Sequence, residues 1–221
     1  METHEVSAVL LSLGVASLAV LLSLPFGLWC GWILARKRFP GKTLFEAIVF
    51  LPLVLPPIVT GFFLLYVLGP ETGLGKLLNI DFLFTWRALV VAAAVVGFPL
   101  MVRPIRAAIE DIDQGLEEAA RTLGHSRWQT LKLVTLPLAR RGILGGSVLA
   151  FARALGEFGA TVMVASNLPG ERTLALEIFN QAAVPGTDEL VMRLALISVA
   201  LSILALVVSE LLLARHTRDA R

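Results

Sequence analysis

The sequence predicts an all-α polytopic membrane protein, a single transmembrane domain of residues 1–221 with five to six transmembrane helices. Two features of its composition support this fold. Hydrophobic residues make up 57% of the chain and charged residues only 16%, whereas soluble domains carry about 25% charged residues. A third observation is that long apolar segments alternate with short basic ones. Such alternation is typical of helices that cross a bilayer repeatedly.

Five apolar segments are candidates for crossing a bilayer, which takes about 20 residues of helix. In the first, Pro25 and Gly27 predict a kink or a change of tilt. In the second, Pro52, Pro56 and Pro57 predict a distorted or broken helix. In chain order, the segments are residues 6–35, 47–68, 88–102, 142–165 and 194–214. Residues 171–183 are more polar, and we expect an interfacial or re-entrant helix there. If it is counted as a membrane helix, the number of transmembrane helices is six and not five.

The distribution of Lys and Arg predicts the orientation, because cytoplasmic loops carry an excess of these residues. With five spans, the three most basic regions fall on one side of the membrane. We expect that side to be cytoplasmic, with the N-terminus outside. The basic residues form no continuous stripe, so we expect no nucleic-acid binding. The three regions are the linker 36–42, the long loop 103–141 and the tail with Arg215, Arg218 and Arg221.

The sequence predicts no catalytic residue, no metal site and no cofactor in this chain. Cys30 is the single cysteine, and the three histidines lie too far apart for a metal-ligand spacing. Gly41-Lys42-Thr43 resembles the end of a phosphate-binding loop, but Arg36 stands where that loop needs a glycine. We therefore expect ATP to be bound by another protein.

The long basic loop, about residues 104–140, is predicted to be cytoplasmic and to contain two short helices. Asp113 is a favourable N-cap for the first helix, and Gly124 is placed to end it. Ser126 and Gln129 have the spacing of a capping box for the second helix. Pro137 is expected to break the chain before the fourth span.

Small side chains at Ala119 and Ala120 leave part of the first predicted helix nearly bare. Another surface can approach such a helix closely, so it suits docking into a groove of a partner protein. The alternative is that the helix packs only against its own loop.

A pattern in the same loop resembles the EAA signature of ABC importer permeases. Glu118-Ala119-Ala120 is followed by Gly124 and then by Val134-Thr-Leu136-Pro137, with the spacing of that signature. The resemblance implies the type I ABC importer permease fold. It also implies a coupling helix that docks into a separate ATP-binding subunit, formed here by Glu118, Ala119, Ala120 and Gly124.

Other stretches resemble the molybdate and sulfate permease branch, and the molybdate permeases most. This implies a multi-pass permease for molybdate in a bacterial or archaeal cytoplasmic (inner) membrane, surrounded by lipid. It implies a homodimer, two copies of the ATP-binding subunit and an extracytoplasmic molybdate-binding protein. A sulfate, thiosulfate or tungstate permease is the alternative. The stretches are Arg38-Phe-Pro-Gly-Lys42, Leu51-Pro-Leu-Val-Leu-Pro-Pro57, Phe98-Pro-Leu-Met-Val-Arg103, Ala152-Arg-Ala-Leu-Gly-Glu-Phe-Gly-Ala160 and Ser166-Asn-Leu-Pro-Gly170.

Two charged residues, Arg153 and Glu157, are predicted to lie inside the fourth span. Their spacing puts them on one helix face, at a depth where an isolated charge costs at least about 2.5 kcal/mol. Gly156 and Gly159 permit close helix contact nearby. We interpret these four residues as candidates for the translocation pathway or its gate. A structural ion pair that fixes helix packing is the alternative.

Two other classes of protein are weaker alternatives. Ion-driven secondary carriers often contain two repeated halves, and we find no internal repeat in this sequence. An intramembrane enzyme would need His, Asp or Glu residues that face one another across spans, and the sequence does not support such a set.

Overall fold

The computed structural model describes residues 3–70, 73–78, 80–166, 168 and 170–218, with the side chains of all but 3, 4, 74, 78 and 209–218. Asn167, Pro169 and Arg221, which figured in the sequence motifs, and the side chains of Arg215 and Arg218 lie outside the described residues. The described secondary structure consists of α1 (Thr3–Arg36), α2 (Lys42–Val54), α3 (Pro57–Val67), α4 (Leu74–Leu78), α5 (Trp86–Glu110), α6 (Gln114–Thr122), α7 (Arg127–Thr130), the π-helix η1 (Leu131–Thr135), α8 (Leu136–Leu138), α9 (Arg140–Leu155), α10 (Thr161–Val164), α11 (Leu174–Ala182) and α12 (Asp188–Arg218).

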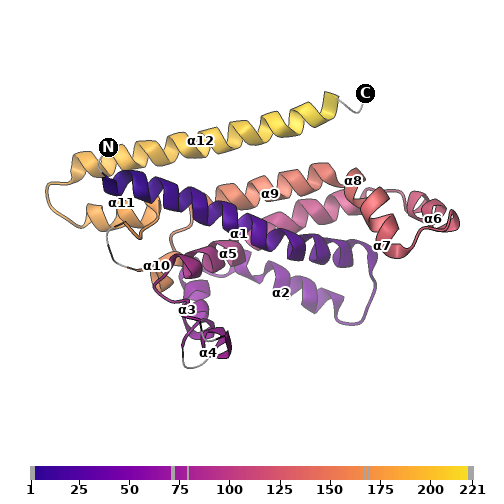
Figure 1. Cartoon of the computed structure of the whole chain (residues 1–221), viewed down its shortest axis with the longest axis horizontal. Helices are drawn as coiled ribbons and strands as arrows, with labels where there is room; N and C mark the ends of the chain where they lie inside the picture. The colour runs from indigo at the N-terminus through magenta and orange to yellow at the C-terminus, as the bar shows by residue number, and fades with distance from the viewer. Residues whose placement is uncertain (1–2, 71–72, 79, 167, 169, 219–221) are drawn as a thin grey trace.

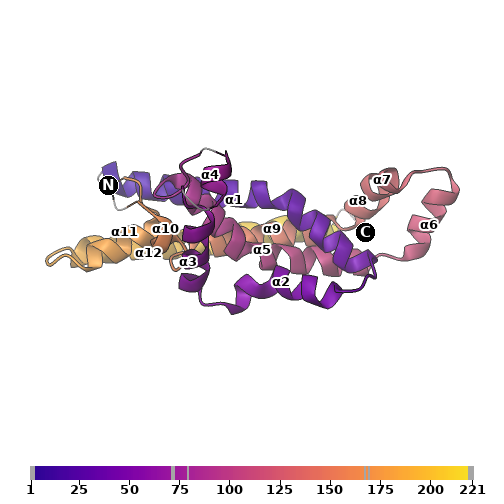
Figure 2. The same cartoon turned by 90° about the horizontal axis from the view of Figure 1, so that it is seen from below.

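Helix α5 forms the centre of the molecule, and α1 and α9 pack along it (Figure 1, Figure 2). Its side chains Leu89, Met101 and Ile105 are completely buried, as expected of a helix that is apolar on several faces. In α12, by contrast, Leu194 is buried while Leu196 is 61% exposed. Helix α12 therefore offers an apolar surface to lipid or to another protein.

Three helices are individually long and apolar enough to cross a membrane, namely α1, α5 and α12. Two further candidate spans are bent: α2 meets α3 at 112°, and the stretch Arg127–Leu138 meets α9 at 70°. The described residues therefore hold up to five spans, within the predicted range. The first bend lies at Pro56, directly before α3, where the proline-rich sequence predicted a break. Pro25 does not interrupt α1, which continues to Arg36.

The loop after α5 begins later than expected. Helix α5 continues past Arg103 to Glu110, because basic residues at a membrane boundary do not by themselves end a helix. Asp111 is its C-cap, and Ala139 separates α8 from α9. We name residues 111–139 the helical loop.

The fourth predicted span, residues 142–165, is not one helix. Helix α9 ends at Leu155, and the short helix α10 begins only at Thr161. Between them the Glu157 carboxylate accepts a hydrogen bond from the backbone N–H of Ala160 at 2.7 Å. This side-chain acceptor competes with the regular helical hydrogen bonds and stabilises the break.

The two ends of the molecule differ in charge. The N-terminus, α11 and the start of α12 lie at one end, while α6 to α8 and the end of α12 lie at the other (Figure 1). The linker between α1 and α2 lies at this second end too. The described residues of the three basic regions that were predicted to share one side of the membrane are therefore at the same end of the structure.

Candidate functional site

Local caps define the first helix of the helical loop, as predicted. The Asp113 carboxylate accepts a hydrogen bond from a backbone N–H in the first turn of α6 at 2.8 Å. At the other end, Gly124 is exposed and has a φ of +93°. The Gly124 N–H bonds to the Arg121 carbonyl at 3.0 Å, and the His125 N–H bonds to the Ala120 carbonyl at 3.2 Å. These two bonds form a Schellman motif, in which glycine is favoured at the position of positive φ.

The second helix begins with the predicted capping box. The Gln129 N–H donates to the Ser126 hydroxyl at 3.2 Å, and the Ser126 N–H donates to the Gln129 side chain at 2.8 Å. The chain breaks before the fourth span as predicted, with a bend of 70°, but the bend lies at Ala139 and not at Pro137 itself. The chain passes through η1, where N–H groups bond to carbonyls five residues back, and Pro137 fits in the first turn of α8. A missing N–H is harmless in a first turn, so the bend follows only at Ala139.

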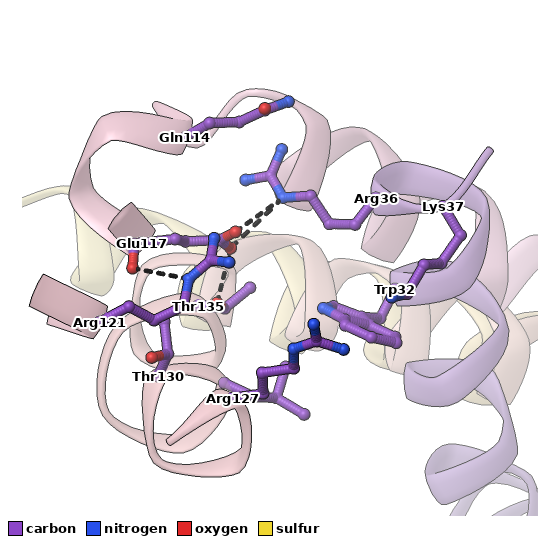
Figure 3. A pocket seen from close by; sticks show the side chains of 10 residues that line it. Trp32, Arg36, Lys37, Gln114, Glu117, Arg121, Arg127, Thr130 and Thr135 are labelled. Atoms are coloured by element: carbon purple, nitrogen blue, oxygen red, sulfur yellow. Dashed lines mark hydrogen bonds and ion pairs between the residues drawn. The ribbon is translucent and has the colours of Figure 1, made fainter. Parts of the chain in front are cut away.

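A buried ion pair connects the helical loop to the end of α1 (Figure 3). Nε of Arg36 lies 3.3 Å from both carboxylate oxygens of Glu117. Arg36 Nη2 also donates to the Ile112 carbonyl at 2.9 Å, and the Thr135 hydroxyl donates to Glu117 Oε1 at 2.7 Å. The Arg36 and Glu117 side chains are only 8% and 10% exposed. This pair was not predicted, because its partners are 81 positions apart and no local spacing indicates the contact.

The residues of the EAA pattern do not share one environment. Glu118 and Ala119 are exposed, whereas Ala120 is buried against its own loop and only 7% exposed. Leu116 and Leu123, which were not predicted, are 51% and 82% exposed. Leu116 lies three residues before Ala119 on the same flank of α6, and Leu123, the C-cap residue four positions after Ala119, continues that flank. Exposed leucines on a polar helix suit apolar contact with another protein.

The structure brings Arg153 and Glu157 together as expected, although Glu157 lies beyond Gly156, the C-cap of α9. Arg153 Nη1 is 2.7 Å from Glu157 Oε2. No donor in the described part of the chain is aligned for a hydrogen bond to Oε2, so this contact is mainly Coulombic. The Glu157 side chain is 1% exposed and that of Arg153 is 31% exposed. Arg153 is therefore the member of the pair that another chain or water can reach.

The start of α3, just after the first bend, touches the break between α9 and α10. A Cβ added at Gly159 would lie 2.6 Å from Cβ of Pro57, and one added at Gly61 would lie 2.6 Å from the Ala160 carbonyl oxygen. Gly159 therefore permits close contact, as predicted. Gly156 does not have this role, because a Cβ there would meet nothing within 4 Å. We name the contact of Pro57 and Gly61 with Gly159 and Ala160 the bend crossing.

Known proteins resemble this chain over nearly its whole length. It is 51% identical to the molybdenum transport system permease protein of Escherichia coli strain K12, over 97% of this chain and 96% of that protein. The protein of the same name in Haemophilus influenzae is 46% identical, over 93% of this chain and 92% of the relative.

A solved structure and a family model agree with this similarity. The crystal structure of a bacterial ABC transporter that imports alginate shares the fold, with a TM-score of 0.78 at 16% identity over 97% of this chain and 80% of that one. The family model of binding-protein-dependent transport system inner membrane components matches residues 23–218. The chain therefore belongs to this family, the membrane-spanning permeases of ABC importers.

Proposed function

We propose that this chain forms the transmembrane pathway of an ATP-driven importer for the molybdate oxyanion. The observation that carries this proposal is the similarity to molybdenum transport permeases over nearly the full length of both proteins. The import mechanism follows from the family, in which a binding protein delivers the substrate. The substrate itself follows from the names of the relatives, which are molybdenum transport permeases.

Three kinds of partner belong to this proposal. An extracytoplasmic binding protein would deliver molybdate at the end of the molecule that holds the N-terminus and α11. Two copies of a separate ATP-binding subunit would bind the basic end, in the cytoplasm. A second copy of this chain would complete the pathway, and the exposed apolar side chains of α3, such as Ile58 at 55% and Phe62 at 58%, are available for that contact or for lipid.

Helix α6 is the part of the chain that we assign to coupling with the ATP-binding subunit. Glu118 and Ala119 are exposed there, and Leu116 and Leu123 add apolar surface. The caps at Asp113 and at Gly124 hold the helix in a defined form without help from a partner. A short preformed helix loses little conformational entropy on docking, which favours binding.

The ion pair of Arg36 and Glu117 gives this docking helix a connection to the membrane region. A displacement of α6 would be transmitted to α1 through the pair and to α9 through α7, η1 and α8. When ATP closes the ATP-binding subunits, the two copies of α6 would be drawn together and the spans would open outward. Hydrolysis would return the pathway to the inward-facing state.

We assign the bend crossing and the neighbouring pair of Arg153 and Glu157 to the pathway or its gate. Glu157 stabilises the break between α9 and α10 through its bond to Ala160, so its role is structural. Arg153 is partly exposed and carries positive charge near the crossing. A molybdate ion that passed this region would meet a cation whose charge is largely compensated by Glu157, which favours transit over tight binding.

The test is uptake of labelled molybdate by proteoliposomes that contain this chain, its ATP-binding subunit and its binding protein. We expect uptake that needs ATP and resists excess sulfate. Ala119→Glu, which puts a carboxylate on the exposed flank of α6, should abolish uptake, while Ala107→Glu, at an exposed position on α5 near the same end, should retain it. Ala120 is unsuitable for this test, because it is buried and its substitution would disturb the loop itself.

Three outcomes would contradict parts of the proposal. Uptake that sulfate abolishes would mean a different cargo for the same transporter. An equal loss of uptake in Ala119→Glu and Ala107→Glu would contradict the assignment of α6 as the docking helix. Uptake driven by an ion gradient without the ATP-binding subunit would contradict ATP-driven import.

A further inference from the structure

A cation-rich cavity of about 190 Å³ lies between the end of α1 and the helical loop (Figure 3). The side chains that line it carry four positive charges and one negative charge, a net charge of +3. The charged residues are Arg36, Lys37, Arg121, Arg127 and Glu117.

The single carboxylate in this cavity is already engaged, since Glu117 pairs with Arg36 and accepts from Thr135. For Lys37, Arg121 and Arg127, no carboxylate among the described residues lies within ion-pair distance. Among the described residues, Arg121 donates only to the backbone carbonyl of Glu117, at 3.2 Å. Three cations that converge without an anion create a positive potential, which favours binding of an anion from outside the chain.

An apolar cavity of about 390 Å³ adjoins the first one and shares Trp32 and Lys37 with it. Its other walls include the aromatic rings of Trp29, Phe39 and Phe45. Trp29 and Phe45 pack edge to face, with ring centroids 6.3 Å apart, and Trp29 is 56% exposed. Lys37 Nζ lies 5.2 Å from the centroid of the Trp32 ring, at the boundary between the two cavities. A charged hollow beside an aromatic groove is complementary to a ligand with an anionic head and an apolar tail.

We propose that the two cavities together bind an anionic phospholipid, with its phosphate among Arg36, Lys37, Arg121 and Arg127 and an acyl chain along the aromatic groove. Basic pockets at the cytoplasmic ends of membrane helices are suited to such headgroups. The bound lipid would bridge α1 and α6 and would hold the helical loop against the membrane region. This inference rests on the proposed function only in placing the loop at the cytoplasmic membrane surface.

The experiment uses the assembled importer in detergent, with equal amounts of phosphatidylglycerol and phosphatidylcholine, and measures retained lipid by native mass spectrometry. The double variant Arg121→Gln, Arg127→Gln should retain about five-fold less phosphatidylglycerol for each cation removed, with phosphatidylcholine unchanged. Arg140→Gln removes an exposed cation at the same end of the molecule but outside both cavities. This control should retain as much phosphatidylglycerol as the unmodified importer.

The groove is tested by Phe45→Ala, which should lower retention of phosphatidylglycerol while leaving all cavity cations in place. Equal retention by the double variant and the Arg140 control would overturn the proposal. So would displacement of the lipid by inorganic phosphate or molybdate together with no effect of Phe45→Ala, because the site would then be one for a free oxyanion. Failure of the importer to assemble would instead count against the proposed function.

Discussion

The helical loop and the bend crossing are both irregular, but they are stabilised in opposite ways. The helical loop is polar, and its helices are held by side-chain caps between residues two or three positions apart, with a long-range ion pair to Arg36. The bend crossing is tightly packed, and glycines let backbone segments from distant parts of the chain approach each other. The loop can therefore keep its form while it moves as a unit, whereas the crossing exists only where the two spans meet.

This difference fits the functions that we propose for the two regions. A docking helix must be preformed and must transmit movement, which local caps and the contacts of Arg36 with the loop allow. A gate must respond to the relative position of spans, and a contact made entirely by tertiary packing does so. Three substitutions test this contrast, in order of expected effect.

The largest effect is expected from breaking the buried ion pair that links the loop to α1. Glu117→Ala would leave Arg36 buried without its partner, which costs about 3–5 kcal/mol when a buried pair loses one member. Chemical denaturation of the purified chain in detergent would measure the free energy of unfolding. Glu118→Ala removes the neighbouring carboxylate, which is exposed, and should change that free energy by less than about 0.5 kcal/mol. Similar values for both variants would mean that the ion pair does not anchor the loop.

A smaller loss is expected at the bend crossing. Gly159→Ala would place a methyl group against Pro57, and overpacking of this kind costs about 1–3 kcal/mol. The matched control is Gly156→Ala, three residues earlier, where the new methyl group meets open space. The same denaturation measurement should separate the two variants. If Gly156→Ala proved as destabilising as Gly159→Ala, backbone conformation and not close packing would explain the glycines.

The smallest effect is expected from a local cap. Ser126→Ala removes the hydroxyl that accepts from Gln129, at a cost of about 1 kcal/mol. Amide hydrogen exchange should become faster in α7 alone, because the cap acts only on its own helix. Ser126→Asp restores an acceptor and should restore slow exchange. Faster exchange that extended into α5 or α9 would show that the cap supports more than local structure.

The helical loop could be predicted almost completely, and the exceptions have a common cause. Asp113, Gly124 and Ser126 act on atoms a few residues away, so their spacing alone indicates their role. The end of α5 was predicted too early, and the predicted bend lies at Ala139 and not at Pro137, since a charge or a proline ends a helix only when no other arrangement satisfies the backbone. The burial of Ala120 and the pairing of Glu117 depend on where α1 and η1 lie, which no local pattern indicates.

The bend crossing could be predicted only in part. The prolines of residues 52–57 indicated a break, and the spacing of Arg153 and Glu157 indicated a pair. The interruption after Leu155 was missed, because an apolar segment with isolated charges also suits a continuous helix. The different roles of Gly156 and Gly159 were missed as well, because a glycine has the same appearance in the sequence whether or not a neighbour approaches it.

The sequence by itself determined the class of the protein, the apolar segments that are candidate spans, the placement of its basic residues and the caps of the docking helix. Each of these follows from hydrophobic length, from the placement of charges or from hydrogen bonds between near neighbours in the chain. Only the tertiary structure decided which α6 residues are exposed, what anchors the loop to α1, where α3 touches the break after α9 and which cations surround the cavity beside Trp32. Each of these features is a contact between residues far apart in the sequence. The energy of such a contact depends on distances that are set only when the helices pack.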